Sequence, residues 1–178
     1  MKHLLLSLAF LLTANTAQAA SSGHSHEHKS KYAGEDNRAV KSLSAKDIAE
    51  LKRGAGWGLA KAAELNGVPG PAHLLELAER IPLNPLQVEK ITLLFQDMKR
   101  QAMEKGERLI VLEQNLENLF VAGTINKKTL RTALEEIGRT RSELRYIHLA
   151  THLATPDILS RQQIEKYNHL RGYKIRAD

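Results

Sequence analysis

The sequence contains no cysteine among its 178 residues. That absence excludes a disulfide framework, a lipoprotein attachment thiol and a catalytic thiol. Aromatic residues make up only 4% of the chain, too few to suggest a base-stacking platform for nucleic acid. No stretch approaches the roughly 20 consecutive apolar residues of a transmembrane helix. Neither a GxSxG elbow nor an HExxH motif occurs, so we expect a protein that is not an enzyme.

The first 19 residues resemble a secretory signal. Lys2 precedes a mostly apolar run at residues 4–12, and residues 17–19 (Ala-Gln-Ala) are small enough for a cleavage site. The apolar run is too short to span a bilayer, so we predict cleavage of residues 1–19 and a periplasmic location. Cleavage removes Lys2 and no acidic residue, so the formal net charge falls from +6 to +5. Export argues against a nucleic-acid partner and favours acidic client proteins or anionic lipid as an explanation of the positive charge.

Residues 20–42 are predicted to form a flexible, His-rich tail, because they are polar and have no apolar period. His24, His26 and His28 lie beside Glu27 in this stretch. Imidazole binds Zn, Cu and Ni well, and an unstructured tail can wrap around an ion. Such a site must be organised on binding, so we expect weak affinity. The alternative is a solvated tail with no metal role.

Residues 43–173 have helical patterns throughout, which predicts an all-α fold. We expect residues 174–178 to form a short C-terminal tail. A helical period between Ile48 and Ala62 is interrupted by Gly54, Gly56 and Gly58. Three interior glycines predict close packing, a kink or a break in that helix. A further short helix opens at a proline at residue 71.

One nine-residue frame occurs twice, as LNPLQVEKI at residues 83–91 and as LSRQQIEKY at residues 159–167. Each copy has the pattern of a capping box, in which a Leu packs as a staple, an Asn or Ser caps the helix and a Gln closes the box. The positions are Leu83, Asn84 and Gln87 in the first copy and Leu159, Ser160 and Gln163 in the second. Helix initiation therefore explains the repetition without any chemistry.

The first box precedes a long heptad pattern. Its apolar positions include Val88, Phe95, Ala102, Leu109 and Leu116. This spacing predicts a helix over about 85–122, and a second pattern predicts another over about 127–153 after a short GTIN turn. We therefore expect an antiparallel helical hairpin with short flanking helices. Leu94, Ile110 and Phe120 lie off the seam, so we also expect a homodimer to cover the remaining apolar stripe.

Two Leu-[Asn/Ser]-x-x-Gln boxes around a long helical hairpin, behind a signal peptide, resemble the Leu-Thr-x-x-Gln boxes of the Spy/CpxP family. The resemblance covers about Leu83 to Tyr173 and extends to ZraP-like proteins and CnrX-type periplasmic heavy-metal sensors. Asn84 and Ser160 stand where the family favours Thr. The resemblance implies a cradle-shaped, dimeric periplasmic protein that acts as a metal sensor, a stress-signalling modulator or an ATP-independent chaperone.

His148 and His152 are the residues that distinguish these functions. An i, i+4 pair places two imidazoles on one helix face, spaced to bind one ion. If the predicted hairpin turns near residue 125, His152 faces Met98 and Asp97. Two imidazoles, a thioether and a carboxylate suit a divalent transition metal such as Zn, Cu, Ni or Co. The alternative is a hydrogen-bonded seam residue His148 and a surface His152. The charge of Arg141 and Arg145, earlier on the same helix face, also argues against a cation.

Two functions therefore stay open. In the first, His148, His152 and the tail detect a heavy metal and alter the interaction with a membrane signalling protein. In the second, the protein is a chaperone that holds unfolded client proteins through apolar patches and the positive charge of Arg131, Arg139 and Arg145.

Overall fold

The computed structural model describes residues 29–173. Every regular element in that range is helical, which confirms the all-α prediction for the described residues. The elements are α1 (Ala45–Lys52), α2 (Lys61–Glu64), α3 (Pro71–Glu76), α4 (Pro85–Val121), α5 (Lys127–Ala154), the 3-10 helix η1 (Pro156–Ile158) and α6 (Arg161–Arg171). The signal sequence, residues 174–178 and the tail histidines His24, His26 and His28 lie outside the described residues.

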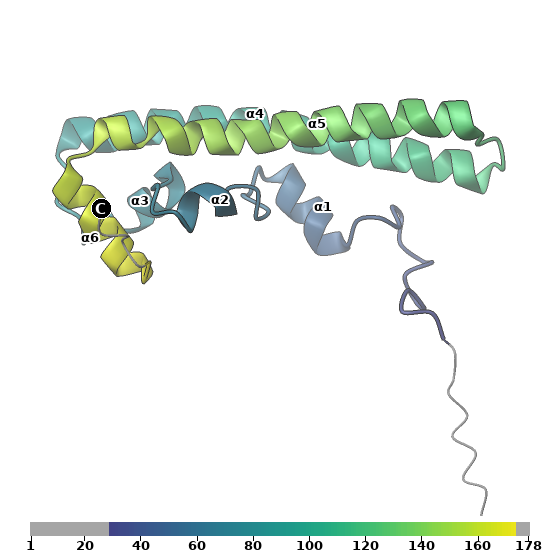
Figure 1. Cartoon of the computed structure of the whole chain (residues 1–178), viewed down its shortest axis with the longest axis horizontal. Helices are drawn as coiled ribbons and strands as arrows, with labels where there is room; N and C mark the ends of the chain where they lie inside the picture. Colours follow the sequence, from purple (N-terminus) through teal and green to yellow (C-terminus); the bar gives the residue numbers. More distant parts are fainter. Residues whose placement is uncertain (1–28, 174–178) are drawn as a thin grey trace, which may run out of the picture. The chain divides into compact units, whose positions relative to one another are not determined.

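Two long helices dominate the fold. α4 and α5 lie side by side and are joined by a short turn, and their predicted ends differ from the observed ones by only one residue (Figure 1). Asn84 caps α4 and Asn126 caps α5, each through its side-chain oxygen. Within the described range, no helix is both long and apolar enough to cross a membrane.

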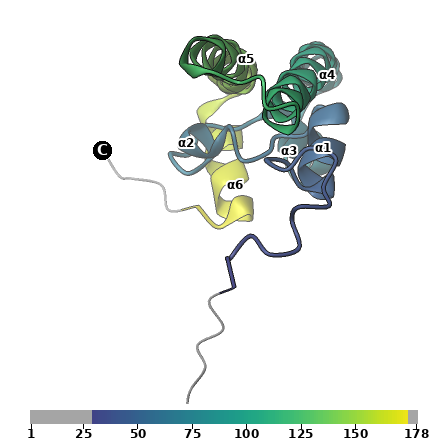
Figure 2. The same cartoon turned by 90° about the vertical axis from the view of Figure 1, so that its right-hand side faces the viewer.

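The short helices line one face of the α4–α5 pair. α1 and α3 pack on α4, and α2 packs on α5, as the end-on view shows (Figure 2). The glycine-rich stretch is a break, one of the three outcomes that its glycines predicted, because α1 ends at Lys52 and α2 begins at Lys61. Gly106 allows α1 to approach closely, because a Cβ at this position would overlap the carbonyl oxygen of Leu51.

Two apolar clusters hold these elements together. The first joins Leu51 of α1 to Leu109 of α4 and Leu144 of α5, and it includes Val40. The second joins Leu74, Ile91 and Tyr167, and it anchors α6. Val40 is only 3% exposed, so the packed region begins before residue 43, where the sequence had placed its start.

The described residues fall into two units. The first is the short segment 29–33, and the second is residues 34–173. The second unit contains all the helices and both apolar clusters, so the candidate site described below lies within it.

Candidate functional site

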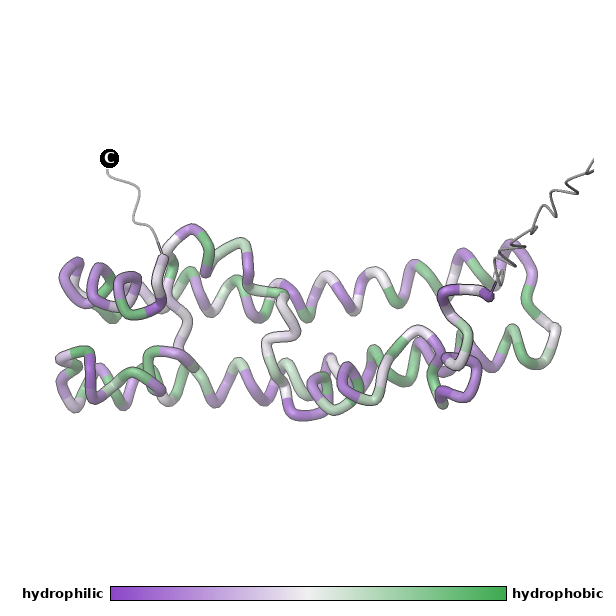
Figure 3. Tube along the Cα trace, turned by 90° about the horizontal axis from the view of Figure 1, so that it is seen from below, coloured by the Kyte–Doolittle hydropathy of each residue, from purple (hydrophilic) through white to green (hydrophobic). Residues whose placement is uncertain are grey.

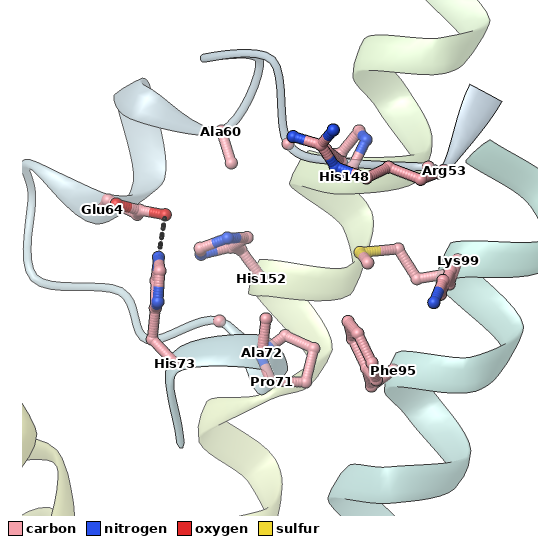
Figure 4. A pocket seen from close by; sticks show the side chains of 15 residues that line it. Arg53, Ala60, Glu64, Pro71, Ala72, His73, Phe95, Lys99, His148 and His152 are labelled. Atoms are coloured by element: carbon pink, nitrogen blue, oxygen red, sulfur yellow. Dashed lines mark ion pairs between the residues drawn. The ribbon is translucent and has the colours of Figure 1, made fainter. Parts of the chain in front are cut away.

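A cavity of about 300 Å³ lies where the short helices meet the α4–α5 pair. Its walls come from the loop after α1, from α2 and α3, from α4 and from α5 (Figure 4). The lining residues of the two long helices are Phe95, Met98, Lys99, His148 and His152. Met98 is only 7% exposed and also lines the cavity. The structure thus brings Met98, His148 and His152, three of the residues singled out in the sequence, to one cavity.

His148 is the most unusual of the three. Its side chain is buried, and its Nε2 atom has no hydrogen-bond partner. Burial, with a smaller contribution from the charge of His152, lowers the pKa of His148 to about 4. The imidazole is therefore neutral near pH 7, which is the form that binds metal ions. A buried polar atom without a hydrogen-bond partner is uncommon in folded proteins, and this nitrogen is able to bond to a ligand that enters the cavity.

His152 is buried as well, and it is held in one tautomer. Its Nδ1 lies 3.0 Å from the carbonyl oxygen of Val68. Because a carbonyl can only accept, Nδ1 carries the proton and the neutral ring has its lone pair on Nε2. Metal-binding histidines commonly use one nitrogen in this way and bind the ion with the other. The chain approaches closely at Gly70, where a Cβ would overlap the imidazole. The alternative that placed His152 on the surface is therefore wrong, because its side chain is buried.

Glu64 and His73 complete the cavity wall, and the sequence reasoning did not identify them. His73 Nε2 lies 3.5 Å from one carboxylate oxygen of Glu64 (Figure 4). The other oxygen accepts a 3.1 Å hydrogen bond from the Tyr173 hydroxyl and lies 3.6 Å from the Arg171 guanidinium. Glu64 therefore links the cavity to the C-terminal end of α6. No local pattern reveals this link, because the residues belong to separate short helices.

Asp97 does not line this cavity, which corrects its predicted position beside His152. Its exposed carboxylate accepts hydrogen bonds from Arg100 at 2.6 Å and from Gln101 at 2.7 Å. The bond from Arg100 is the main reason that the pKa of Asp97 is lowered. Asp97 instead lines the groove between α4 and α5 together with Leu94 and Gln101.

The charge of Arg141 is directed toward the loop after α1. The guanidinium lies 4.8 Å from the centre of the Trp57 ring, a cation–π contact. Trp57 has a φ of 43° and donates from its indole nitrogen to Asp47 at 2.8 Å. Arg141 is not among the cavity-lining residues, but Arg53 and Lys99 are, so two positive side chains still flank the site.

The two capping boxes contact each other. Gln87 and Gln163 each accept a bond from the backbone amide of their own cap residue, at 3.0 and 2.8 Å. Their side-chain amides also bond reciprocally, with both N–O distances 2.9 Å. Gln163 further donates to Pro82 and Gln87 to Ile158, each at 2.8 Å. The repeated frame therefore joins the start of α4 to the start of α6, a role beyond helix initiation that the spacing alone did not reveal.

The remaining predicted residues lie elsewhere. Arg131, Arg139 and Arg145 are exposed along α5, away from the cavity lining. Among residues 29–173, no group of three or more His, Asp or Glu side chains is positioned to hold a metal ion. The cavity thus offers two imidazoles and a thioether, with the Glu64–His73 pair at its wall.

Comparison of the chain with protein-family models, with curated proteins and with solved structures found no match.

Proposed function

We propose that this chain is a non-catalytic periplasmic protein that binds and senses a divalent transition metal through His148, His152 and Met98. The observation that supports this proposal best is the unpartnered Nε2 of the buried His148, in the same cavity as a second imidazole. The fixed tautomer of His152 also leaves a lone pair on Nε2.

The donor set favours borderline or soft metals. Imidazole and thioether ligands suit Cu, Ni, Co or Zn, whereas Mg and Ca require oxygen ligands. Three donors leave one or more positions for water or for the carboxylate of Glu64. A bound cation would add to the positive charge of Arg53 and Lys99, so we expect the carboxylate of Glu64 to be recruited as a compensating charge.

Sensing requires that the bound metal change another part of the molecule. His152 holds residue 68 through its Nδ1, and Glu64 holds Arg171 and Tyr173 of the C-terminal segment. We propose that metal binding redistributes these two contacts and alters the surface offered to a membrane signalling protein. The antiparallel hairpin and the homodimer expected from the family resemblance are part of this proposal.

Calorimetric titration of the exported chain with Zn, Cu, Ni and Co tests the metal site. A variant that lacks residues 20–33 removes the tail histidines but keeps Val40, which belongs to the core. We expect this variant to retain one binding event and its His148→Gln derivative to lose it. His169→Gln is the matched control, because His169 is an exposed histidine on α6. If the tail-shortened protein binds none of these metals at neutral pH, the sensor proposal fails.

The chaperone function is the second candidate, because an exposed groove runs between α4 and α5. Leu94, Tyr146 and Ala150 line it, and the Tyr146 side chain is 72% exposed. Exposed apolar grooves are common binding sites for other chains. A chaperone would suppress aggregation of an unfolded client without metal, and Tyr146→Ser would weaken that suppression. Equal suppression by the parent and the variant would remove this candidate.

A further inference from the structure

The turn that joins α4 to α5 has an unusual composition. Residues 118–134 contain Lys127, Lys128 and Arg131 and no acidic residue. All three cations are exposed. Phe120 and Val121 are 56% and 74% exposed, although both side chains are apolar. We call residues 118–134 the apex. It therefore combines exposed apolar side chains with a net positive charge, and the nearest acidic residues, Glu117 and Glu135, lie just outside it.

The apex forms one end of the α4–α5 pair. It lies at the opposite end of the helix pair from α6, and apolar residues continue to the end of the tube (Figures 1 and 3). Its backbone is ordered by local bonds: Thr124 donates to the carbonyl of Leu119 at 3.2 Å, and Asn126 caps α5. Gly123 has the positive φ of 63° that such a helix ending requires. The exposed residues are thus presented on a formed turn.

We propose that the apex docks on an anionic membrane surface. Charge complementarity requires a negative partner, because residues 118–134 carry three positive charges and no negative one. The apolar residues lie at the turn that ends the α4–α5 pair. Such a turn fits a deformable interface, whereas insertion into another protein would require a matching pocket. Exposed Phe and Val side chains that enter the headgroup region, with Lys and Arg beside the lipid phosphates, are the arrangement of interfacial membrane anchors. This proposal stands independently of the metal site.

The site would bind reversibly. Each Lys or Arg near an anionic surface contributes about a fivefold increase in binding at physiological salt. Two apolar side chains add to this but do not approach the apolar area of a membrane-spanning helix. We therefore expect affinity that falls as salt concentration rises, since the electrostatic contribution is screened.

Vesicle co-sedimentation tests the proposal with the chain purified after export, its N-terminus established by mass spectrometry. The probes are vesicles of phosphatidylglycerol with phosphatidylethanolamine, and vesicles of phosphatidylcholine alone. We expect the protein to bind the vesicles that contain phosphatidylglycerol, whether or not a chelator is present, and to bind the phosphatidylcholine vesicles much more weakly. Lys127→Gln with Lys128→Gln should lower binding on the order of 25-fold, from about fivefold per charge. The double variant Phe120→Ser, Val121→Ser should lower it at least severalfold.

The controls match exposure and charge. Leu93→Ser changes a residue on another part of α4 whose side chain is 58% exposed, an exposed fraction similar to that of Phe120. Lys46→Gln with Lys166→Gln removes two exposed lysines outside the apex. Both controls should bind as the parent does. In the Phe120→Trp variant, the indole fluorescence at position 120 should shift to shorter wavelength when anionic vesicles are added. Absence of vesicle binding, equal losses in the controls, or apex variants that lose binding to an unfolded protein but not to vesicles would overturn the proposal.

Discussion

Acidification should destabilise this protein through one buried histidine. His148 has its pKa lowered to about 4 by burial and by the charge of His152, whereas an unfolded chain has a histidine pKa of 6.5. The unfolded state therefore takes up the proton first as the pH falls. The contribution of the neutral side chain to stability is fully present above pH 6.5 and is lost between 6.5 and about 4.

The size of the loss follows from the two pKa values. The difference between 6.5 and about 4, at 1.36 kcal/mol per pH unit, corresponds to about 3 kcal/mol of unfolding free energy. This is a large part of the 5–15 kcal/mol that is typical of a folded domain. The pKa of Asp47 is lowered chiefly by its hydrogen bond with Ser44, and that of Glu143 by its hydrogen bond with Lys105. The contributions of these two carboxylates to stability are therefore also lost on acidification.

Urea denaturation at pH of about 7 and about 4 measures the effect, with a chelator present so that no metal contributes. The comparison is between the parent and His148→Gln, which keeps a polar side chain of similar length without a titrating group. Because both proteins share the carboxylates, the difference between their two losses isolates His148. We expect the parent to lose about 3 kcal/mol more than the variant. Equal losses would show that His148 is not held neutral by burial.

Two further predictions concern stability. Gln87→Ala and Gln163→Ala should each lower the free energy of unfolding by roughly 0.5–2 kcal/mol, as the loss of a helix cap does. In the double variant the two losses should not add, because the two side-chain amides bond each other, and additive losses in urea denaturation would contradict that pairing. Gly106→Ala should destabilise the fold, because its Cβ would overlap a backbone carbonyl of α1, whereas Gly138→Ala, an exposed helical position with nothing within 4 Å, should raise stability by about 0.5–1 kcal/mol. Thermal unfolding of the two glycine variants measures the effect. The melting temperature should fall for Gly106→Ala and rise for Gly138→Ala, and changes of the same sign would contradict the prediction.

The sequence by itself determined the helical elements. Capping residues and apolar spacing are local properties, since a side chain caps the backbone three residues away and a helix repeats every 3.6 residues. The ends of α4 and α5 were therefore predicted to within one residue, and both Gln side chains bond their cap amides as expected. The glycines predicted close packing, a kink or a break at residues 53–60, and the apolar spacing did not distinguish the break from the other two.

Only the tertiary structure decided what surrounds the histidines. Helical spacing put His148 and His152 on one face, but the residues that bury them come from α2, α3 and their loops, whose packing no local pattern specifies. Glu64 and His73 reach the cavity for this reason, and Asp97 is excluded from it because it lies on another side of α4. The reciprocal bond between Gln87 and Gln163 likewise joins residues 76 positions apart. Such contacts depend on how whole helices dock, and docking is set by side-chain shape and burial summed over the core rather than by the spacing of residues along one helix.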